Sequence, residues 1–343
     1  MSRRIVQCLS HSIESFDMMK LYHSIGHEVF DVGGLIDPRS PHDDKRPALP
    51  DVPFYPELKA AVDAIGSPDN LGAAQSHLPD ALLEWADTIV YHHYLDRLYI
   101  QWPRIRDWLR GDANRRVIWR SVGQSVEGNE RTAVPFRREG LERVAYSPKE
   151  QNIPGYAGHD ALIRFYVDPD EWHGWIGSEE RVIQVTQHLR QRDPYTNWGF
   201  WDAATRGLPN MPLGPGSEAI GGPGSLSYAD MQEWLRTARA YLYTGTQPAS
   251  YTLGLIEALM TGIPVLSIGP SLMSIFPYGP DLFEGHELAS GWTDHPETAA
   301  TQLRLLLDDH AVQLERVSEH QRQRAIEMFG MDRIKAEWTA YLA

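Results

Sequence analysis

One segment, residues 241–269, combines strand and helix character and restricts the fold more than any other part of the chain. It reads YLYTGTQPASYTLGLIEALMTGIPVLSIG. Residues 241–243 form a short apolar run that predicts a strand, and residues 265–268 predict a second one. Between them, apolar residues recur at helical spacing and predict a helix that starts near Ser250, a favoured N-cap residue. Strand, helix and strand in this order are typical of an α/β fold.

The first turn of this helix, residues 251–254, is a natural binding place for a phosphate or a sugar hydroxyl. Its backbone N–H groups have no partner inside the helix, and the helix dipole gives this end a partial positive charge. Glu257 follows on the same helix. Its carboxylate is either solvated or directed into a ligand site, where it could accept both hydroxyls of a ribose.

This segment resembles the donor-site signature of family 4 glycosyltransferases of the GT-B fold. In that family a Glu, an aromatic-Gly-Leu triplet and a second Glu precede the pattern A-x-x-x-G-x-P-V. The residues that match in register are Tyr251, Leu253, Glu257, Ala258, Gly262, Pro264 and Val265. The resemblance implies that Glu257 holds the nucleotide ribose and that residues 250–254, with Ser250 and Thr252 among them, surround the donor. Ala249 stands where the family has its first Glu, and Thr252 where it has Gly, so the handling of the sugar stays open.

The size and composition of the chain favour two globular domains. It has 343 residues, of which 42% are hydrophobic, enough for two ordinary cores. No apolar run approaches the length of a membrane span, and the start, MSRRIVQCLSHSIES, lacks the apolar core of a secretory signal, so we expect a cytoplasmic protein. Cys8 is the only cysteine, which excludes an internal disulfide and a Cys-based metal cluster. We expect it in the core.

Charge is distributed unevenly along the chain. The formal net charge of −14 argues against a protein that coats nucleic acid. Residues 97–143 contain eleven Arg, no Lys and six acidic residues, a local net charge of +5, which leaves −19 for the rest. This region is either a solvated Arg-rich helix face or a basic face for an anionic acceptor, with Arg137 and Arg138 as acceptor-side candidates.

The chain opens with a strand at residues 5–9, a polar loop, a helix to about Ser24 and a strand at residues 29–32. A strand-helix-strand start predicts parallel strands. The Gly-His-Glu-Val sequence before the second strand resembles the opening of many GT-B glycosyltransferases, although HSIESF replaces their usual Gly pair. His11 and Ser12 in this loop could still face an acceptor or a donor phosphate.

Two histidines follow the strand predicted at residues 88–91. His92 and His93 lie at its carboxyl end, which is where ligands bind in open parallel sheets. A buried structural histidine is the commoner situation, and a His pair alone is weak evidence for a metal. Family 4 enzymes often have Asp-Val-Val-His-x-His at this place, with Val90 here in place of the first His. The resemblance implies that His92 touches the donor sugar as the catalytic candidate, with His93 as a weaker, acceptor-side candidate.

The segment HDALIRFYVDPDEWHGW resembles the family's crossing between domains, with Val167 and Asp168 matching. We therefore predict an acceptor-side domain at residues 1–168 and a donor domain at residues 169–330. A helix within residues 331–343 is expected to cross back to the first domain.

The loop QHLRQRDP follows a strand predicted at residues 181–186. The resemblance implies cations here that neutralise the donor diphosphate, and His188, Arg190 and Arg192 are the nearest. Arg suits this task because its planar fork grips two phosphate oxygens, but a solvated Arg pair is equally compatible with the sequence. Further along, Ser227 is expected to cap a helix, and residues 222–226 are expected to lie against the nucleobase.

Together these matches run in order from Ile5 to the end of the chain and imply the GT-B fold: two Rossmann-like α/β domains with parallel sheets that face a central cleft. They imply a hexosyltransferase that moves a sugar from a nucleoside diphosphate sugar, UDP-sugar first, to an acceptor hydroxyl with retention and without a metal. The acceptor could be modified DNA, a lipid or a glycan. A sugar-nucleotide epimerase of the same fold, or a catalytically impaired nucleotide-sugar binding protein, remains open.

Overall fold

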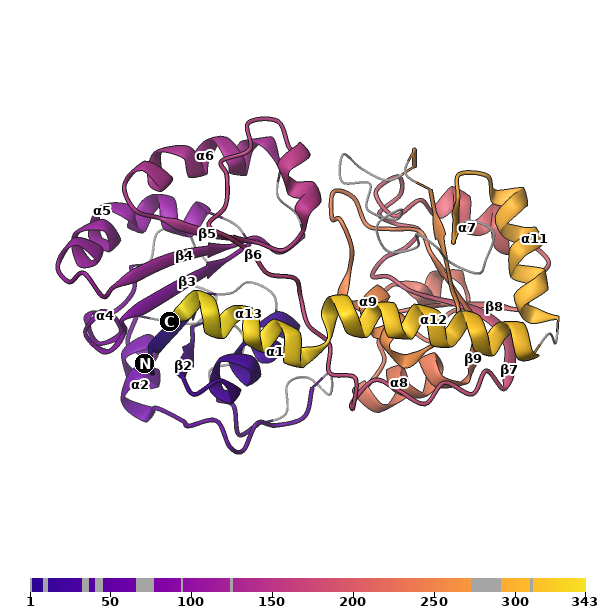
Figure 1. The fold of residues 1–343 in the computed structure, drawn as a ribbon, viewed down its shortest axis with the longest axis horizontal. Helices are drawn as coiled ribbons and strands as arrows, with labels where there is room; N and C mark the ends of the chain where they lie inside the picture. The colour runs from indigo at the N-terminus through magenta and orange to yellow at the C-terminus, as the bar shows by residue number, and fades with distance from the viewer. Residues whose placement is uncertain are drawn as a thin grey trace. The chain divides into compact units, whose positions relative to one another are not determined.

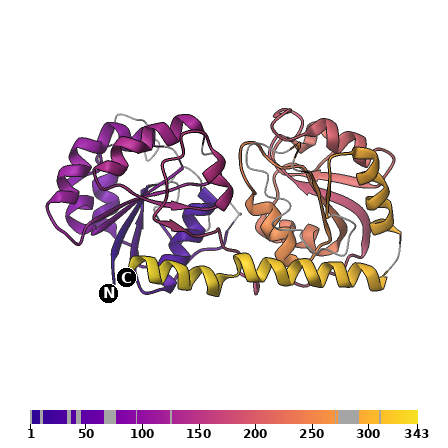
Figure 2. The same ribbon diagram turned by 45° about the horizontal axis from the view of Figure 1, so that its top comes forward.

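The computed structural model describes residues 2–8, 12–32, 37–40, 46–65, 77–93, 95–123, 126–269, 271–272, 291–308 and 311–343. The chain divides into two compact units. Unit 1 comprises Met1–Ile163 and Glu337–Ala343, and unit 2 comprises Arg164–Ala336. Each unit contains one sheet with helices packed on it (Figure 1, Figure 2). Every pair of neighbouring strands in both sheets is parallel, which confirms the predicted α/β fold with two parallel sheets.

Unit 1 is built on a six-stranded sheet with the order β2-β1-β3-β4-β5-β6. Its strands are β1 Arg4–Cys8, β2 Glu28–Asp31, β3 Thr88–His92, β4 Arg116–Arg120, β5 Glu142–Ala145 and β6 Ala161–Leu162. Its helices are α1 Ser12–Ser24, α2 Pro56–Asp63, α4 Asp80–Trp85, α5 Asp96–Arg110, α6 Glu127–Arg138 and the 3-10 helix η1 Pro148–Asn152.

The two faces of this sheet differ in chemistry because side chains alternate along each strand. On one face, Val6, Ile89 and Val117 pack into a single apolar core with residues of α2, α4, α5 and α6. Cys8 belongs to this core, as predicted. The other face carries His92 and Arg120 at paired positions of β3 and β4. It is covered by α1 and by the last part of the final helix, which run side by side (Figure 1, Figure 2).

Unit 2 is built on a five-stranded sheet with the order β11-β10-β9-β7-β8. Its strands are β7 Glu179–Val185, β8 Asn210–Leu213, β9 Ala238–Tyr243, β10 Val265–Ile268 and β11 Trp292–Thr293. Its helices are α7 Trp198–Thr205, η2 Ser217–Ile220, α8 Tyr228–Thr237, α9 Leu253–Thr261, α11 Pro296–Leu307 and α12 Ala311–Phe329. The final helix, α13 Met331–Leu342, begins in unit 2 and ends in unit 1.

A buried ionic cluster holds several elements of unit 1 together. Arg143 on β5 is fully buried, and its guanidinium lies between the carboxylates of Glu130 on α6 and Glu150 on η1. Its carbon Cζ also lies 4.3 Å from the ring centroid of Trp119 and 4.6 Å from that of Tyr156. Burial raises the pKa of Glu150 above its ordinary value, and Arg143 opposes this shift. Arg143 is therefore a structural residue.

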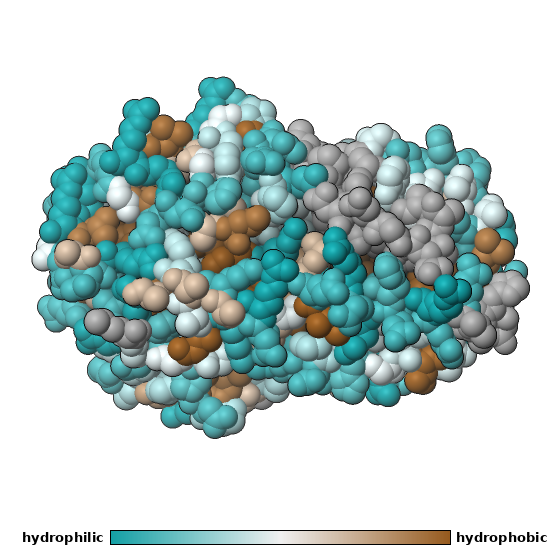
Figure 3. All heavy atoms as spheres, viewed as in Figure 1, coloured by the Kyte–Doolittle hydropathy of each residue, from teal (hydrophilic) through white to brown (hydrophobic). Residues whose placement is uncertain are grey.

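On the face shown in Figure 3, hydrophobic residues form small separate groups among hydrophilic ones. Within the part of the chain that the structure describes, no helix has the length and apolar character that spanning a membrane requires.

The cap of α8 agrees with the sequence prediction. The side-chain oxygen of Ser227 accepts the backbone N–H of Asp230 at 3.1 Å. We expect Ser227→Ala to lower the free energy of unfolding by about 1 kcal/mol, because this N–H loses its partner at the helix end. Urea denaturation followed by circular dichroism measures the change. The exposed Ser225 is the matched control, and an equal loss in Ser225→Ala would contradict the capping role.

Candidate functional site

The start of α9 differs from the predicted one by a few residues. Thr252, not Ser250, is the N-cap: its side-chain oxygen accepts the N–H of Leu255 at 3.4 Å, and the helix begins at Leu253. The prediction that Ser250 caps this helix is therefore wrong. Ser250 and Tyr251 are both buried ahead of the helix.

Tyr251 explains the late start. Its ring packs edge-on against Phe165 and Phe329, at centroid distances of 5.5 and 5.2 Å, and its hydroxyl accepts the backbone N–H of Phe165. The chain thus enters the core at Tyr251 before it turns into a helix. The side chain of Tyr251 is thus engaged in the core, and its backbone is the part available to a donor.

The first turn of α9 lies at the carboxyl edge of the unit 2 sheet. β9 and β7 are parallel neighbours, so the loops that follow them leave from the same edge. Gly254 packs directly on the end of β7: a Cβ at this glycine would lie 3.5 Å from Cβ of Val185 and 3.7 Å from its carbonyl oxygen. The partially positive end of α9 therefore adjoins the loop that follows β7.

Glu257 lies on α9 and is only 7% exposed. The interpretation of Glu257 as a solvated helix residue is therefore wrong. Its charge acts on the hydroxyl of Tyr241, whose pKa is raised mainly by burial and further by Glu257. The same hydroxyl accepts the backbone N–H of Val185 at 3.1 Å. Buried carboxylates concentrate at ligand sites.

The loop after β7 carries the three predicted cations. His188 adopts a left-handed backbone conformation with φ of 52°, and its N–H donates to the carbonyl of Pro215 at 2.6 Å. Arg192 donates its backbone N–H to the carbonyl of His188 at 2.9 Å. Arg190 is exposed, with its Cζ 5.9 Å from the ring centroid of Trp198. Backbone bonds thus shape this loop, and the two Arg side chains are carried at the same sheet edge as the start of α9.

The glycine-rich loop after β8 is tightly closed. The N–H of Gly214 donates to the carbonyl of Gly224 at 3.1 Å, and the N–H of Gly222 donates to that of Ser217 at 2.9 Å. A Cβ at Gly222 would lie 2.2 Å from the carbonyl oxygen of Pro212, so only glycine fits there. β8 pairs in parallel with β7, which puts this loop beside the cationic loop. That position is compatible with the nucleobase contact expected at residues 222–226.

In unit 1, β3 extends one residue further than predicted and includes His92. His92 is buried, and its Nδ1 lies 3.5 Å from a carboxylate oxygen of Glu14 on α1. Sequence reasoning did not select Glu14. The only signal for it was a carboxylate inside HSIESF, the segment that replaces the family's glycine pair.

The other two histidine candidates are placed differently. His93 follows β3 in a left-handed backbone conformation with φ of 72°. Its backbone N–H donates to the carbonyl of Arg120, and its carbonyl accepts the indole N–H of Trp119. These bonds involve only the backbone of His93. That its ring contacts the acceptor stays a prediction. His11 lies outside the described residues.

Several arginines of the Arg-rich region are buried or paired with acids. Arg120 and Arg143 are fully buried, and Arg116 pairs with Glu142. Arg137 pairs with Asp160, which also accepts the backbone N–H of Arg143. The local charge of +5 therefore overstates the basic surface, because the acids that neutralise it include residues beyond the region. Arg138 is exposed and stays a candidate.

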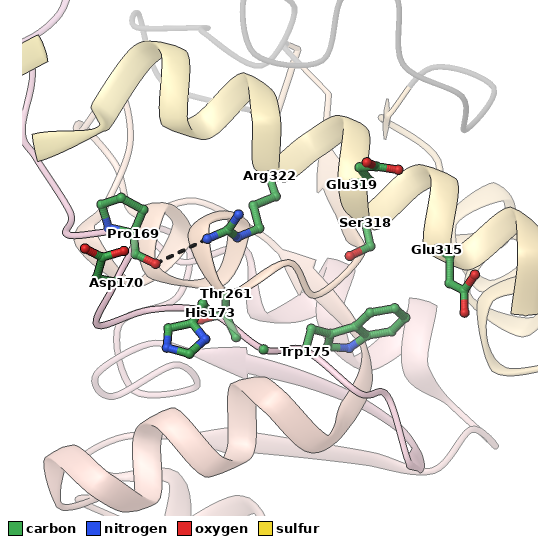
Figure 4. Close-up of a pocket in the computed structure, with 10 residues that line it drawn as sticks. Pro169, Asp170, His173, Trp175, Thr261, Glu315, Ser318, Glu319 and Arg322 are labelled. Atoms are coloured by element: carbon green, nitrogen blue, oxygen red, sulfur yellow. Dashed lines mark hydrogen bonds between the residues drawn. The ribbon is translucent and has the colours of Figure 1, made fainter. Parts of the chain in front are cut away.

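A hollow of about 700 Å³ opens at the other end of α9 (Figure 4). Arg322 from α12 donates there to the carbonyls of Met260 and Pro169. A cation at a helix C-terminus satisfies free carbonyls and the negative end of the dipole. This hollow contains none of the predicted donor residues, and Arg322 in it stabilises the end of the helix.

One pair of aspartates has the spacing of a metal motif. Asp168 and Asp170 have Asp-x-Asp spacing, but a carboxylate oxygen of Asp168 accepts the backbone N–H of Asp170 at 3.0 Å, as in a local turn. Over the described ranges, no group of three or more His, Cys, Asp or Glu side chains is arranged to hold a metal ion.

No protein-family profile matches the sequence, and no curated protein matches it. Solved structures match over nearly the whole chain. A glycosyltransferase from Rickettsia africae has a TM-score of 0.66 at 11% identity, covering 99% of this chain and 98% of the other. Anabaena HepE in complex with UDP and glucose has a TM-score of 0.64 at 12% identity, with 99% of each chain covered. An E. coli protein described as trehalose-6-phosphate, bound with UDP-2-fluoro glucose, has a TM-score of 0.57 at 11% identity. The match covers 99% of this chain and 98% of the other.

At such low identity, agreement along the whole chain is evidence about architecture. Two α/β units, each with a parallel sheet, agree with these structures from end to end. The chain has the GT-B fold of glycosyltransferases.

Proposed function

We propose that this protein is a glycosyltransferase that uses a nucleoside diphosphate sugar, with a UDP-sugar as the first choice. The observation that carries the proposal is the arrangement at one sheet edge of unit 2. The first turn of α9, the buried Glu257 and the loop with Arg190 and Arg192 all lie there. HepE and the E. coli protein, which have the same fold, are described with UDP and glucose and with UDP-2-fluoro glucose, and this supports UDP-sugar as the donor.

Each part of the site has a separate task in this proposal. Glu257 accepts the ribose hydroxyls, and the backbone N–H groups at residues 252–254 bind the diphosphate. Arg190 and Arg192 add positive charge on the other side of the diphosphate. His188 lies in the same loop and is available to a phosphate oxygen. Unit 2 is therefore the donor domain, and residues 1–168 are the acceptor side.

The reaction follows from where charge develops. The bond between the anomeric carbon of the sugar and the β-phosphate oxygen breaks, the acceptor oxygen bonds to that carbon, and the proton of the acceptor hydroxyl passes to an oxygen of the departing diphosphate. Negative charge builds on the departing UDP, where the helix end and the two Arg side chains stabilise it. We propose retention of configuration, following the resemblance of residues 251–265 to family 4 enzymes. His92 is the proposed contact to the sugar.

Incubation with a panel of nucleotide sugars, first without and then with candidate acceptors, tests this function. A transferase leaves most of the donor intact or slowly hydrolyses it to free sugar and UDP. An epimerase returns a changed sugar still attached to UDP, and a binding protein returns the donor unchanged even when candidate acceptors are added. Ala249, which stands in the place of a family carboxylate, is the reason to keep the last alternative. Modified DNA, lipid and glycan acceptors belong in the panel, and Arg138 is the residue to vary for anionic ones.

We expect transfer to persist in excess EDTA. Arg190, Arg192 and the start of α9 supply the positive charge that a metal ion would otherwise bring to the diphosphate. Initial rates with and without chelator, after dialysis, provide the measurement. Complete loss of activity that magnesium or manganese restores would contradict the proposed role of these groups.

A further inference from the structure

A layer of polar side chains is buried between the unit 1 sheet and the two helices on its His92 face. Arg120 on β4 neighbours His92 on β3, and its guanidinium donates to the carbonyls of Ala145 and Ile163. Tyr22 on α1 packs edge-on against Trp338 on α13, at a centroid distance of 5.3 Å. Polar groups with this degree of burial normally serve a specific network or a ligand.

Glu14 and His92 face each other inside this layer. Their side chains are 6% and 0% exposed, and Nδ1 of His92 lies 3.5 Å from Oε1 of Glu14. Among the described residues, these two atoms and Nε2 of His92 have no hydrogen-bond partner by geometric criteria. Within the described residues, Nδ1 thus has one carboxylate within reach and Nε2 has no partner, which leaves Nε2 open to a bound group.

The protonation state of the ring follows from its surroundings. Burial lowers the pKa of His92 below its ordinary value, Glu14 opposes this shift, and Arg120 adds to it. Tyr22 on α1 also interacts with Glu14, and burial raises the pKa of Tyr22 far above its ordinary value, so it is neutral. A neutral imidazole carries one N–H, and the carboxylate of Glu14 favours it on Nδ1. Nε2 then presents a lone pair.

We propose that Glu14 is a positioning residue that fixes His92 as a hydrogen-bond acceptor through Nε2. A group that this nitrogen binds must donate a hydrogen bond, as a sugar hydroxyl does and a carboxylate cannot. On the proposed function, where His92 contacts the donor sugar, Nε2 accepts a hydrogen bond from a hydroxyl of that sugar. The role of Glu14 itself concerns only unit 1 and does not depend on that function.

The tautomer of His92 tests the role of Glu14 directly. Long-range proton–nitrogen NMR of histidine-labelled protein at pH 7, assigned with His92→Gln, shows which ring nitrogen carries the proton. We expect Nδ1–H in the unaltered protein and a mixture with Nε2–H in Glu14→Ala. Glu28→Ala, which removes a more exposed carboxylate of the same unit, should leave the signal unchanged. Nε2–H or an imidazolium in the unaltered protein, or an unchanged tautomer in Glu14→Ala, would overturn the assignment.

Turnover tests the contact to the sugar. Glu14→Ala should lower turnover of UDP-glucose about tenfold while the affinity for UDP alone stays the same. Unchanged turnover of UDP-glucose in Glu14→Ala would overturn this contact. If neither UDP nor any donor binds, the proposed function and the contact both fail, while the tautomer still decides whether Glu14 positions His92.

Discussion

Glu257→Ala should weaken the binding of UDP and of UDP-sugars by about 2 to 3 kcal/mol, because a charge-assisted hydrogen bond to the ribose is lost. The burial of Glu257 on α9 supports this size of effect, since a desolvated carboxylate forms stronger hydrogen bonds than an exposed one. Isothermal titration calorimetry with UDP provides the measurement.

A matched control separates the ribose contact from general effects of charge. Glu233 lies on α8 of the same unit, and its side chain is 63% exposed. Glu233→Ala should leave the affinity for UDP unchanged. Unchanged affinity in Glu257→Ala as well would remove Glu257 from the site, and equal thermal stability of both variants would show that the comparison is between folded proteins.

Arg143→Met should lower the free energy of unfolding by about 3 to 5 kcal/mol, which is the usual cost of leaving buried charges without a partner. The guanidinium is the cation between Glu130 and Glu150, and all three side chains are fully buried. Met preserves much of the apolar contact with Trp119 and Tyr156, so the loss measures mainly the charge. Chemical denaturation, followed by tryptophan fluorescence, provides the comparison.

Arg131→Met is the control for this variant. Arg131 pairs with Glu127 one helical turn away on α6, and its side chain is 73% exposed. Exposed pairs contribute at most about 1 kcal/mol, so its denaturation midpoint should barely move. Similar midpoints for the two variants would show that the buried cluster does not stabilise unit 1 in the way its geometry indicates.

Elements with a strong local pattern were predicted well from the sequence. The strands β1, β3, β9 and β10 are short apolar runs, and their predicted bounds lie within a few residues of the observed ones. The elements around Glu257 were predicted for the same reason, because strand, turn and helix lie within one short segment. Helices α5 and α6 gave no such signal, since each contains an internal proline, Pro103 or Pro135, that usually marks a helix end.

What the sequence could not reveal depends on contacts between distant residues. Arg143 looked like part of a basic region, yet its partners Glu130 and Glu150 become visible only when α6, β5 and η1 pack together. Glu14 likewise meets His92 only because β1 and β3 are neighbours in the sheet. Charge counts along a sequence cannot detect such pairing, because burial and neutralisation are properties of the packed fold.

The central claim is that a nucleoside diphosphate binds at the carboxyl edge of the unit 2 sheet, and hydrogen–deuterium exchange tests it most directly. Saturating UDP should slow exchange in peptides that cover residues 250–257 and residues 187–192, because the ligand covers the N–H groups at the start of α9 and orders the Arg190 loop. Exchange in the hollow near Arg322 should not change. Unaltered exchange at residues 250–257 under saturating UDP, with protection only elsewhere, would contradict the proposed site.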